Sequence, residues 1–341
     1  MGARQARLTA IDLCAGVGGQ AIGLEAAGFE VTTVLDIDAD SCRTLADNRP
    51  AWQVINEDLH QVVPTDHPTL DHADLLACGL PRSPYSAAGR QYAGDDRRDT
   101  LRDALDMAGY VQPRAFVLEN IPGFVNSKKF NAERDLVRAE LKQSGYETSW
   151  AVFDAQHFGV PQRREHGFMV AMRPHDMANF SWPEPPRPSC PTLGETLRTS
   201  MASKGWPEAD RWAALASEVA PTIVGGATNR GGADLGPSRS KAIWARLGVH
   251  GASLGNDVPS PDFRLDLEAE SRDGLPRLTV DQVCLLQGFA PEWRIHGKKT
   301  SAYRQISQTV PPVVAEAVGR QIERALRGVP TDTTSTSTRL F

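Results

Sequence analysis

The feature that most constrains the fold is a glycine-rich segment that directly follows the first apolar run. Leu8–Cys14 predicts a buried strand, and the segment Ile11–Gly19 (IDLCAGVGG) ends in glycines before a helix expected from about Gln20 to Ala27. Glycines let the backbone approach a ligand closely, and a helix N-terminus offers unpaired N–H groups. The spacing of these glycines differs from the dinucleotide fingerprint GxGxxG. This difference favours an adenosyl ligand other than a dinucleotide.

A second apolar run, about 20 residues further on, ends in an acidic residue. Val31–Leu35 predicts a strand that is followed by Asp36, Ile37 and Asp38. A carboxylate at this place accepts hydrogen bonds from a ribose diol in Rossmann-like sites. Asp58, after the third apolar stretch, is expected near the adenine.

Short apolar runs continue to alternate with amphipathic helical segments through the first half of the chain. Further strands are predicted at Leu75–Ala77 and Ala115–Leu118, and helices at Thr100–Ala108 and Ala132–Gln143. Strands that alternate with helices indicate a parallel sheet. The predicted fold class is therefore α/β.

The composition changes near residue 174. Residues 174–275 are rich in Gly, Pro, Ser and Trp, which predicts a smaller, loop-rich domain with short strands. Helical patterns return at Val280–Gln287 and Val313–Leu326. The predicted domains are residues 1–173, residues 174–275, a segment 276–328 that returns to the first domain, and a disordered tail at 329–341.

Bulk composition excludes several classes of protein. The net charge is -5, so a nucleic-acid-binding face would need a local basic surface. No apolar run approaches the roughly 18 residues of a membrane span, and Met1–Ala10 lacks a secretory apolar region. The five cysteines form no CxxC pair, which predicts no metal site and favours the reducing cytoplasm. These cysteines are Cys14, Cys42, Cys78, Cys190 and Cys284.

Six segments, in order along most of the chain, resemble those of one enzyme family. They are Asp12–Gly19, Ser86–Leu101, Glu119–Ile121, Val160–Arg164, Arg277–Phe289 and Gln305–Pro312. With them the chain resembles a DNA (cytosine-5) methyltransferase of the bacterial restriction–modification type. The resemblance implies a Rossmann-like, S-adenosylmethionine-dependent methyltransferase fold, double-stranded DNA as the partner, and a target-recognition domain at 174–275.

The resemblance also assigns most of the site. The residues it implies for S-adenosylmethionine are Asp12, Cys14, Ala15, Gly16, Gly18, Gly19, Asp36, Ile37, Asp58, Gln308 and Val310. Ser86–Leu101 would be a mobile loop that closes over DNA, and glycines of the second domain would meet the duplex. The DNA contacts expected are Ser86, Arg97, Arg98, Arg163, Gly225, Gly226 and Arg230.

The segment that should hold the reactive thiol departs from the family's pattern. The resemblance implies a cysteine after a proline, which adds to C6 of cytosine, together with a glutamate that binds N3 and arginines that hold the base. At that place this chain has Pro81-Arg82-Ser83. A guanidinium stays protonated and cannot attack carbon. The predicted catalytic residues are Glu119, Arg164, Arg82 at the nucleophile position, and Ser83.

Other departures fall in the same site. His166 stands where the family's QxRxR segment would have a second arginine, and Ser307-Gln308 stands where Gly-Asn is usual. Cys14 replaces the usual phenylalanine beside the cofactor. These changes touch the nucleophile, the base clamp and the cofactor pocket, which together predict altered or lost chemistry.

Three functional hypotheses stay open from the sequence. In the first, the chain is an enzyme with changed chemistry, for example transfer to the exocyclic N4 amine of a flipped cytosine. In the second, it is an inactive DNA-binding regulator or the partner of an active methyltransferase. In the third, C5 methylation persists through Cys78 or Ser83. A restriction endonuclease partner and a monomeric state are further expectations.

Overall fold

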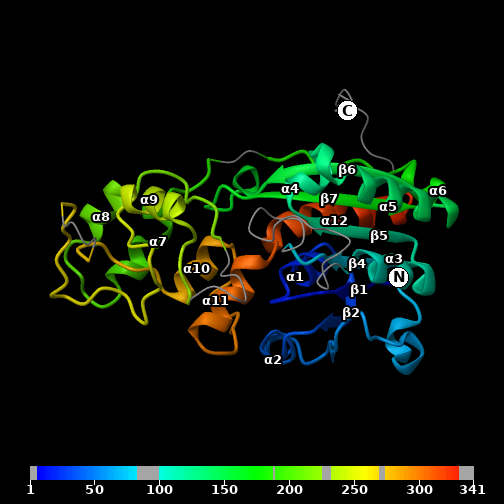
Figure 1. The fold of residues 1–341 in the computed structure, drawn as a ribbon, viewed down its shortest axis with the longest axis horizontal. Helices are drawn as coiled ribbons and strands as arrows, with labels where there is room; N and C mark the ends of the chain where they lie inside the picture. The colour runs from blue at the N-terminus through cyan, green and yellow to red at the C-terminus, as the bar shows by residue number, and fades with distance from the viewer. Residues whose placement is uncertain (1–5, 83–99, 187–188, 225–231, 269–272, 330–341) are drawn as a thin grey trace, which may run out of the picture.

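The computed structural model describes residues 6–82, 100–186, 189–224, 232–268 and 273–329. Two lobes follow one another along the long axis of the molecule, one built on a sheet and the other on short helices (Figure 1). The tail predicted to be disordered lies outside the described residues from position 330 onward. In the part of the chain that is described, no helix is long and apolar enough to cross a membrane.

A seven-stranded sheet with the order β3-β2-β1-β4-β5-β7-β6 forms the centre of the first lobe. Its strands are β1 (Thr9–Leu13), β2 (Glu30–Asp36), β3 (Gln53–Asn56), β4 (Leu75–Gly79), β5 (Ala115–Asn120), β6 (Glu147–Asp154) and β7 (Glu165–Met172). The first five strands in this order pair in parallel. The predicted α/β class is therefore confirmed.

The expectation of a parallel sheet is wrong for the last two strands. β7 runs antiparallel to both β5 and β6. The crossover from β5 to β6 leaves one strand position open between them, and β7 fills this position. Only a short connection, residues 155–164, joins β6 to β7, and so short a link allows an antiparallel return and no crossover.

Helices cover both faces of the sheet. On one face α1 (Gly19–Ala26) packs against α12 (Pro312–Leu326), which comes from the far end of the chain (Figure 1). On the other face α3 (Leu101–Val111) and α5 (Asn131–Gln143) bury their apolar sides. The remaining helices of this lobe are α2 (Ala39–Asn48), α4 (Pro122–Asn126) and α6 (Pro174–Met177).

The second lobe is helical. The prediction of short strands there is wrong for the described residues of this lobe. Its helices are α7 (Leu193–Ala202), α8 (Ala209–Leu215) and α9 (Ser238–Arg246), with α10 (Val280–Leu286) and α11 (Lys299–Gln308) packed on the same core. A capping box between Thr192 and Glu195 begins α7, and this signal is present in the sequence itself. The glycines and prolines separate short helices here, and the exact domain boundaries remain predictions.

The closing segment of the chain presses on the start of α1. Gly18, the N-cap of α1, has a φ of 90°, a left-handed conformation that favours glycine. A Cβ on Gly19 would lie 2.1 Å from the carbonyl oxygen of Val310 and 2.2 Å from Thr309 Oγ1. The shape of the predicted cofactor loop therefore depends on residues almost 300 positions away in the chain.

Replacing Gly19 with alanine should lower the free energy of unfolding by about 1–3 kcal/mol, because the backbone of residue 310 must move to admit the methyl group. Urea denaturation of the purified protein measures this change. Gly109→Ala, in α3, is the matched control, because nothing lies within 4 Å of the place that a Cβ would take there. The control should be neutral or stabilising by up to about 1 kcal/mol. An unchanged midpoint for Gly19→Ala would contradict the close contact.

Candidate active site

A cavity of about 480 Å³ lies at the carboxyl ends of β1, β2, β4 and β5. Ligand sites of open α/β sheets form at this edge, and the volume suits a small-molecule ligand. Gly18 and Gly19 shape the start of α1 beside it. The predicted cofactor residues that line it are Asp12, Cys14, Ala15, Gly16, Asp36, Ile37, Asp58, Gln308 and Val310. Glu119 and Arg82 also line this cavity.

Asp36, at the end of β2, holds the glycine loop in place. Its Oδ2 accepts a hydrogen bond from the backbone N–H of Gly16 at 2.7 Å, and its Oδ1 accepts one from the backbone N–H of Asp38 at 2.8 Å. Burial raises the pKa of Asp36, although these hydrogen bonds oppose the rise. Asp36 therefore shapes the loop as well as lining the cavity where a ribose was expected.

Asp12, on β1, is a fully buried acid at the cavity wall. Gln20 Nε2 donates a hydrogen bond to its Oδ1 at 3.1 Å. Burial and the nearby charge of Asp36 raise the pKa of Asp12 to about 8. Among the described residues, no donor of normal geometry reaches Asp12 Oδ2 or Gln20 Oε1. The Gln20 amide oxygen, and the Asp12 carboxylate once it ionises, suit a cationic ligand that carries N–H donors.

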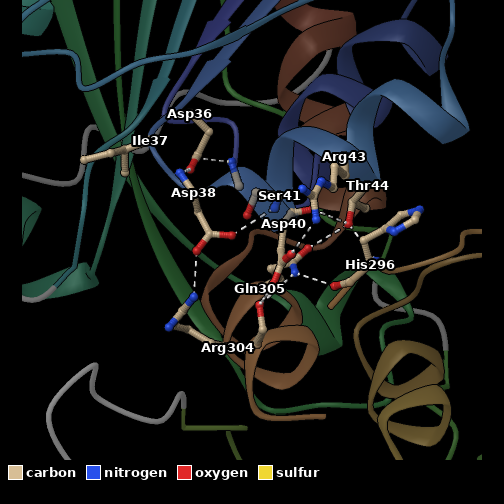
Figure 2. Close-up of polar contacts among 12 residues, drawn as sticks. Asp36, Ile37, Asp38, Asp40, Ser41, Arg43, Thr44, His296, Arg304 and Gln305 are labelled. Carbon is tan, nitrogen blue, oxygen red and sulfur yellow. Dashed lines mark hydrogen bonds and ion pairs between the residues drawn. The ribbon is translucent and has the colours of Figure 1, made fainter. Parts of the chain in front are cut away.

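The rim of the cavity joins the two halves of the chain (Figure 2). Asp38 caps α2 by accepting a hydrogen bond from Ser41 N at 2.9 Å, and Arg304 Nη2 of α11 lies 2.6 Å from its Oδ2. Deeper along α2, Thr44 Oγ1 donates to Gln305 Oε1 at 2.9 Å. Sequence reasoning missed Arg304, because its partner Asp38 is 266 positions away and no local pattern links them.

Three strand ends bring Arg82, Glu119 and His166 together. Glu119 Oε1, at the end of β5, lies 2.7 Å from Arg82 Nη2 and 2.7 Å from His166 Nδ1. Arg82 Nη2 is also 2.8 Å from His166 Nδ1. Because β7 is antiparallel, its first residues meet the carboxyl ends of β4 and β5 at the same edge.

This cluster is largely hidden from solvent. The exposed fraction of the side chain is 19% for Arg82, 5% for Glu119 and 0% for His166. Burial alone would favour a neutral Glu119, but Arg82 and the His166 hydrogen bond outweigh it, so the pKa of Glu119 lies below its ordinary value. Burial lowers the pKa of His166 to about 4, which makes this imidazole neutral at neutral pH.

The two neighbouring arginines of the QxRxR-like segment have different environments. Arg164 is buried, and its guanidinium donates to the carbonyl oxygens of Ile223 and Ser307, both at 2.8 Å. It therefore braces the two lobes, and its catalytic role stays a prediction. Arg163 is half-exposed and pairs with Glu218 at 2.6 Å, so it is accessible for the DNA contact predicted.

The cysteine considered as a substitute nucleophile is poorly suited to that role. Cys78, on β4, has no exposed surface, and a hydrogen bond with Cys14 together with burial raises its pKa well above the ordinary value. A thiol that keeps its proton is a weak nucleophile. Cys14 lies in the cofactor loop at the cavity wall.

Several predicted residues cannot be placed. Ser83 and the expected DNA contacts Ser86, Arg97, Arg98, Gly225, Gly226 and Arg230 lie outside the described residues. Within the described ranges, no group of three or more His, Cys, Asp or Glu side chains could hold a metal ion.

Comparison with known proteins identifies the family. The family model described as C-5 cytosine-specific DNA methylase matches residues 8–324. The chain belongs to this family. Members use S-adenosylmethionine as methyl donor, and the buried acceptors of Asp12 and Gln20 fit its sulfonium and ammonium groups. The family resemblance and the cofactor expected from the sequence are thereby confirmed.

The relatives cover nearly all of this chain. It is 40% identical over 322 residues to the Type II methyltransferase M.NaeI of Lentzea aerocolonigenes, spanning 94% of this chain and 75% of the relative. It is 37% identical over 323 residues to M.NgoMIV of Neisseria gonorrhoeae, spanning 94% and 99%. The solved structure of the S. pombe Dnmt2 methyltransferase shares the fold, with a TM-score of 0.62 at 16% identity over 95% of this chain and 99% of that one.

Asp12 should make cofactor binding depend on pH. Below its pKa of about 8 this side chain is neutral, and above it the carboxylate attracts a cationic ligand. The affinity for S-adenosylmethionine should therefore rise between about pH 6.5 and pH 7.5, below the range in which the ligand's own ammonium group loses its proton, with proton release near pH 7. Calorimetry in buffers of different ionisation enthalpy measures both effects. Asp12→Asn should bind more weakly and without this dependence, and an identical pH profile in the variant would exclude the role of Asp12.

Proposed function

We propose that this protein binds S-adenosylmethionine and a specific duplex DNA site, and that it does not form 5-methylcytosine through a cysteine adduct. It would act as a catalytically inactive DNA-binding regulator or as the partner of an active methyltransferase. The observation that carries the proposal is the Arg82 guanidinium at the thiol position, 2.7 Å from Glu119. A flipped cytosine would meet an ion pair there instead of a thiol and an available carboxylate.

The surroundings of Arg82 offer no replacement for the thiol among the described residues. Cys78 is buried and keeps its proton, and Cys14 belongs to the cofactor loop. His166 is neutral, and its Nδ1 lies within hydrogen-bond distance of Glu119. Addition to C6 needs a strong nucleophile, so the described residues offer the covalent route no starting group.

The binding functions rest on parts of the site that Arg82 leaves unchanged. The cavity keeps its glycine loop, Asp36 and the unused acceptors of Asp12 and Gln20. The named relatives are DNA-methylating enzymes of the Type II class, which supports duplex DNA as the ligand of this chain. In the regulator form of the proposal we expect a cytoplasmic monomer, and in the partner form a complex with the active methyltransferase; a restriction endonuclease is the genetic neighbour expected in both.

Expression in a bacterial host that lacks cytosine methylation, followed by mass spectrometry of its nucleosides, tests the chemistry on every DNA sequence at once. We expect no 5-methylcytosine above the empty-vector control, because no thiolate is available. The M.NgoMIV methyltransferase, expressed in the same host, is the positive control. A clear 5-methylcytosine signal from this chain would refute the proposal, and N4-methylcytosine would replace it with changed chemistry.

Binding is measured separately on the purified protein. Calorimetry should detect binding of S-adenosylmethionine to the protein. Selection of protein-bound duplexes from a random pool should enrich one DNA sequence. Absence of both kinds of binding would rule out a regulatory role.

A further inference from the structure

Glu119 is a buried carboxylate that has to find a positive partner inside the protein. An isolated ion in such surroundings is strongly unfavourable, whereas a paired and hydrogen-bonded ion is tolerated. The ionisable side chains that act on it are Arg82 after β4, Cys78 on β4, Asp12 on β1, Arg164 before β7 and His166 in β7. Cys78 and Asp12 are not cations, so three candidates remain.

His166 contributes a hydrogen bond and no charge. It is neutral at neutral pH, because burial disfavours the imidazolium and the adjacent Arg82 repels it. One ring nitrogen, Nδ1, lies within hydrogen-bond distance of both Glu119 and Arg82. A neutral ring nitrogen cannot both donate to Glu119 and accept from Arg82. We therefore place the proton on Nδ1, from which it is donated to the carboxylate, and Arg82 donates its hydrogen bond to Glu119 alone.

Arg164 is committed elsewhere. Its two terminal nitrogens donate to the carbonyl oxygens of Ile223 and Ser307, so its charge acts on Glu119 only from a distance. Arg82 is therefore the one cation within hydrogen-bond distance of Glu119 in the described part of the chain.

We infer that Arg82 is a positioning residue for Glu119: it supplies the positive charge that keeps this buried carboxylate ionised at the cavity wall. The contact of His166 Nδ1 with the same oxygen marks position 166 as the second place from which a cation could do so. The inference deepens the proposed function, because it explains what occupies the base-binding carboxylate. A neutral side chain at position 82, such as a thiol, would leave Glu119 without its charge partner.

Infrared spectroscopy of the protein alone tests this inference, and it needs neither DNA nor cofactor. Loss of a band in Glu119→Gln identifies the signal of this side chain, and Asp12→Asn identifies the protonated Asp12. In the unaltered protein Glu119 should give a carboxylate band and no protonated carboxyl band at neutral pH. Arg82→Gln should make the protonated band appear, because no cation within hydrogen-bond distance then opposes the effect of burial, and the distant charge of Arg164 is too weak to do so alone.

Two variants restore a cation by different routes. Arg82→Lys, and the double variant Arg82→Gln with His166→Arg, should both return Glu119 to the ionised form. Arg102→Gln is the matched control, because this arginine pairs with Glu140 on the exposed surface and should leave the Glu119 band unchanged.

An ionised Glu119 in Arg82→Gln would overturn the inference, and so would a double variant that fails to restore ionisation. If Arg82→Gln does not fold, thermal denaturation decides: recovery of folding in the double variant supports the inference, and its failure to fold refutes it. These results do not depend on whether 5-methylcytosine forms, so they stand apart from the test of the proposed function.

Discussion

The buried carboxylate of Glu119 is the constraint on which the active site depends. It lies at the end of a central strand, where the sheet leaves little solvent and only neighbouring strands can supply a partner. Arg82 and His166 reach it because β4 ends, and β7 begins, at the same edge of the sheet. The site therefore requires β7 to be antiparallel. A parallel strand would place the last residues of β7, and not His166, at the edge of the sheet where Glu119 lies.

The last part of the chain completes the site by three different kinds of contact. The backbone of Val310 lies against Gly19 and fixes the start of α1. The carbonyl of Ser307 accepts a hydrogen bond from the buried Arg164, and Arg304 pairs with Asp38 at the cavity rim. Because α11 also packs on α10 in the core of the second lobe, the cofactor cavity and this lobe share one structural support.

Sequence reasoning succeeded where local patterns carry the information. The strand–glycine–helix order and the apolar runs predicted the α/β fold, and the motif order led to the family and its cofactor. It failed where partners are distant in the chain. The contacts of Arg164 with Ile223 and Ser307 could not be foreseen, and the antiparallel β7 depends on an open place in the sheet. Gly and Pro content alone also could not separate short helices from short strands in the second lobe.

The position of Arg82 shows how the proposed loss of chemistry is compatible with a stable fold. A charged side chain at a partly buried position would ordinarily destabilise the fold, but here Glu119 already needs a cation. The guanidinium therefore occupies Glu119, the carboxylate predicted to bind the base, while Gln20 holds Asp12 by a separate hydrogen bond on the first strand and helix. Arg82 and Glu119 line the same cavity as Asp12 and Gln20 but come from other strands, so a change at Arg82 leaves the residues expected to bind the adenosyl cation in the chain.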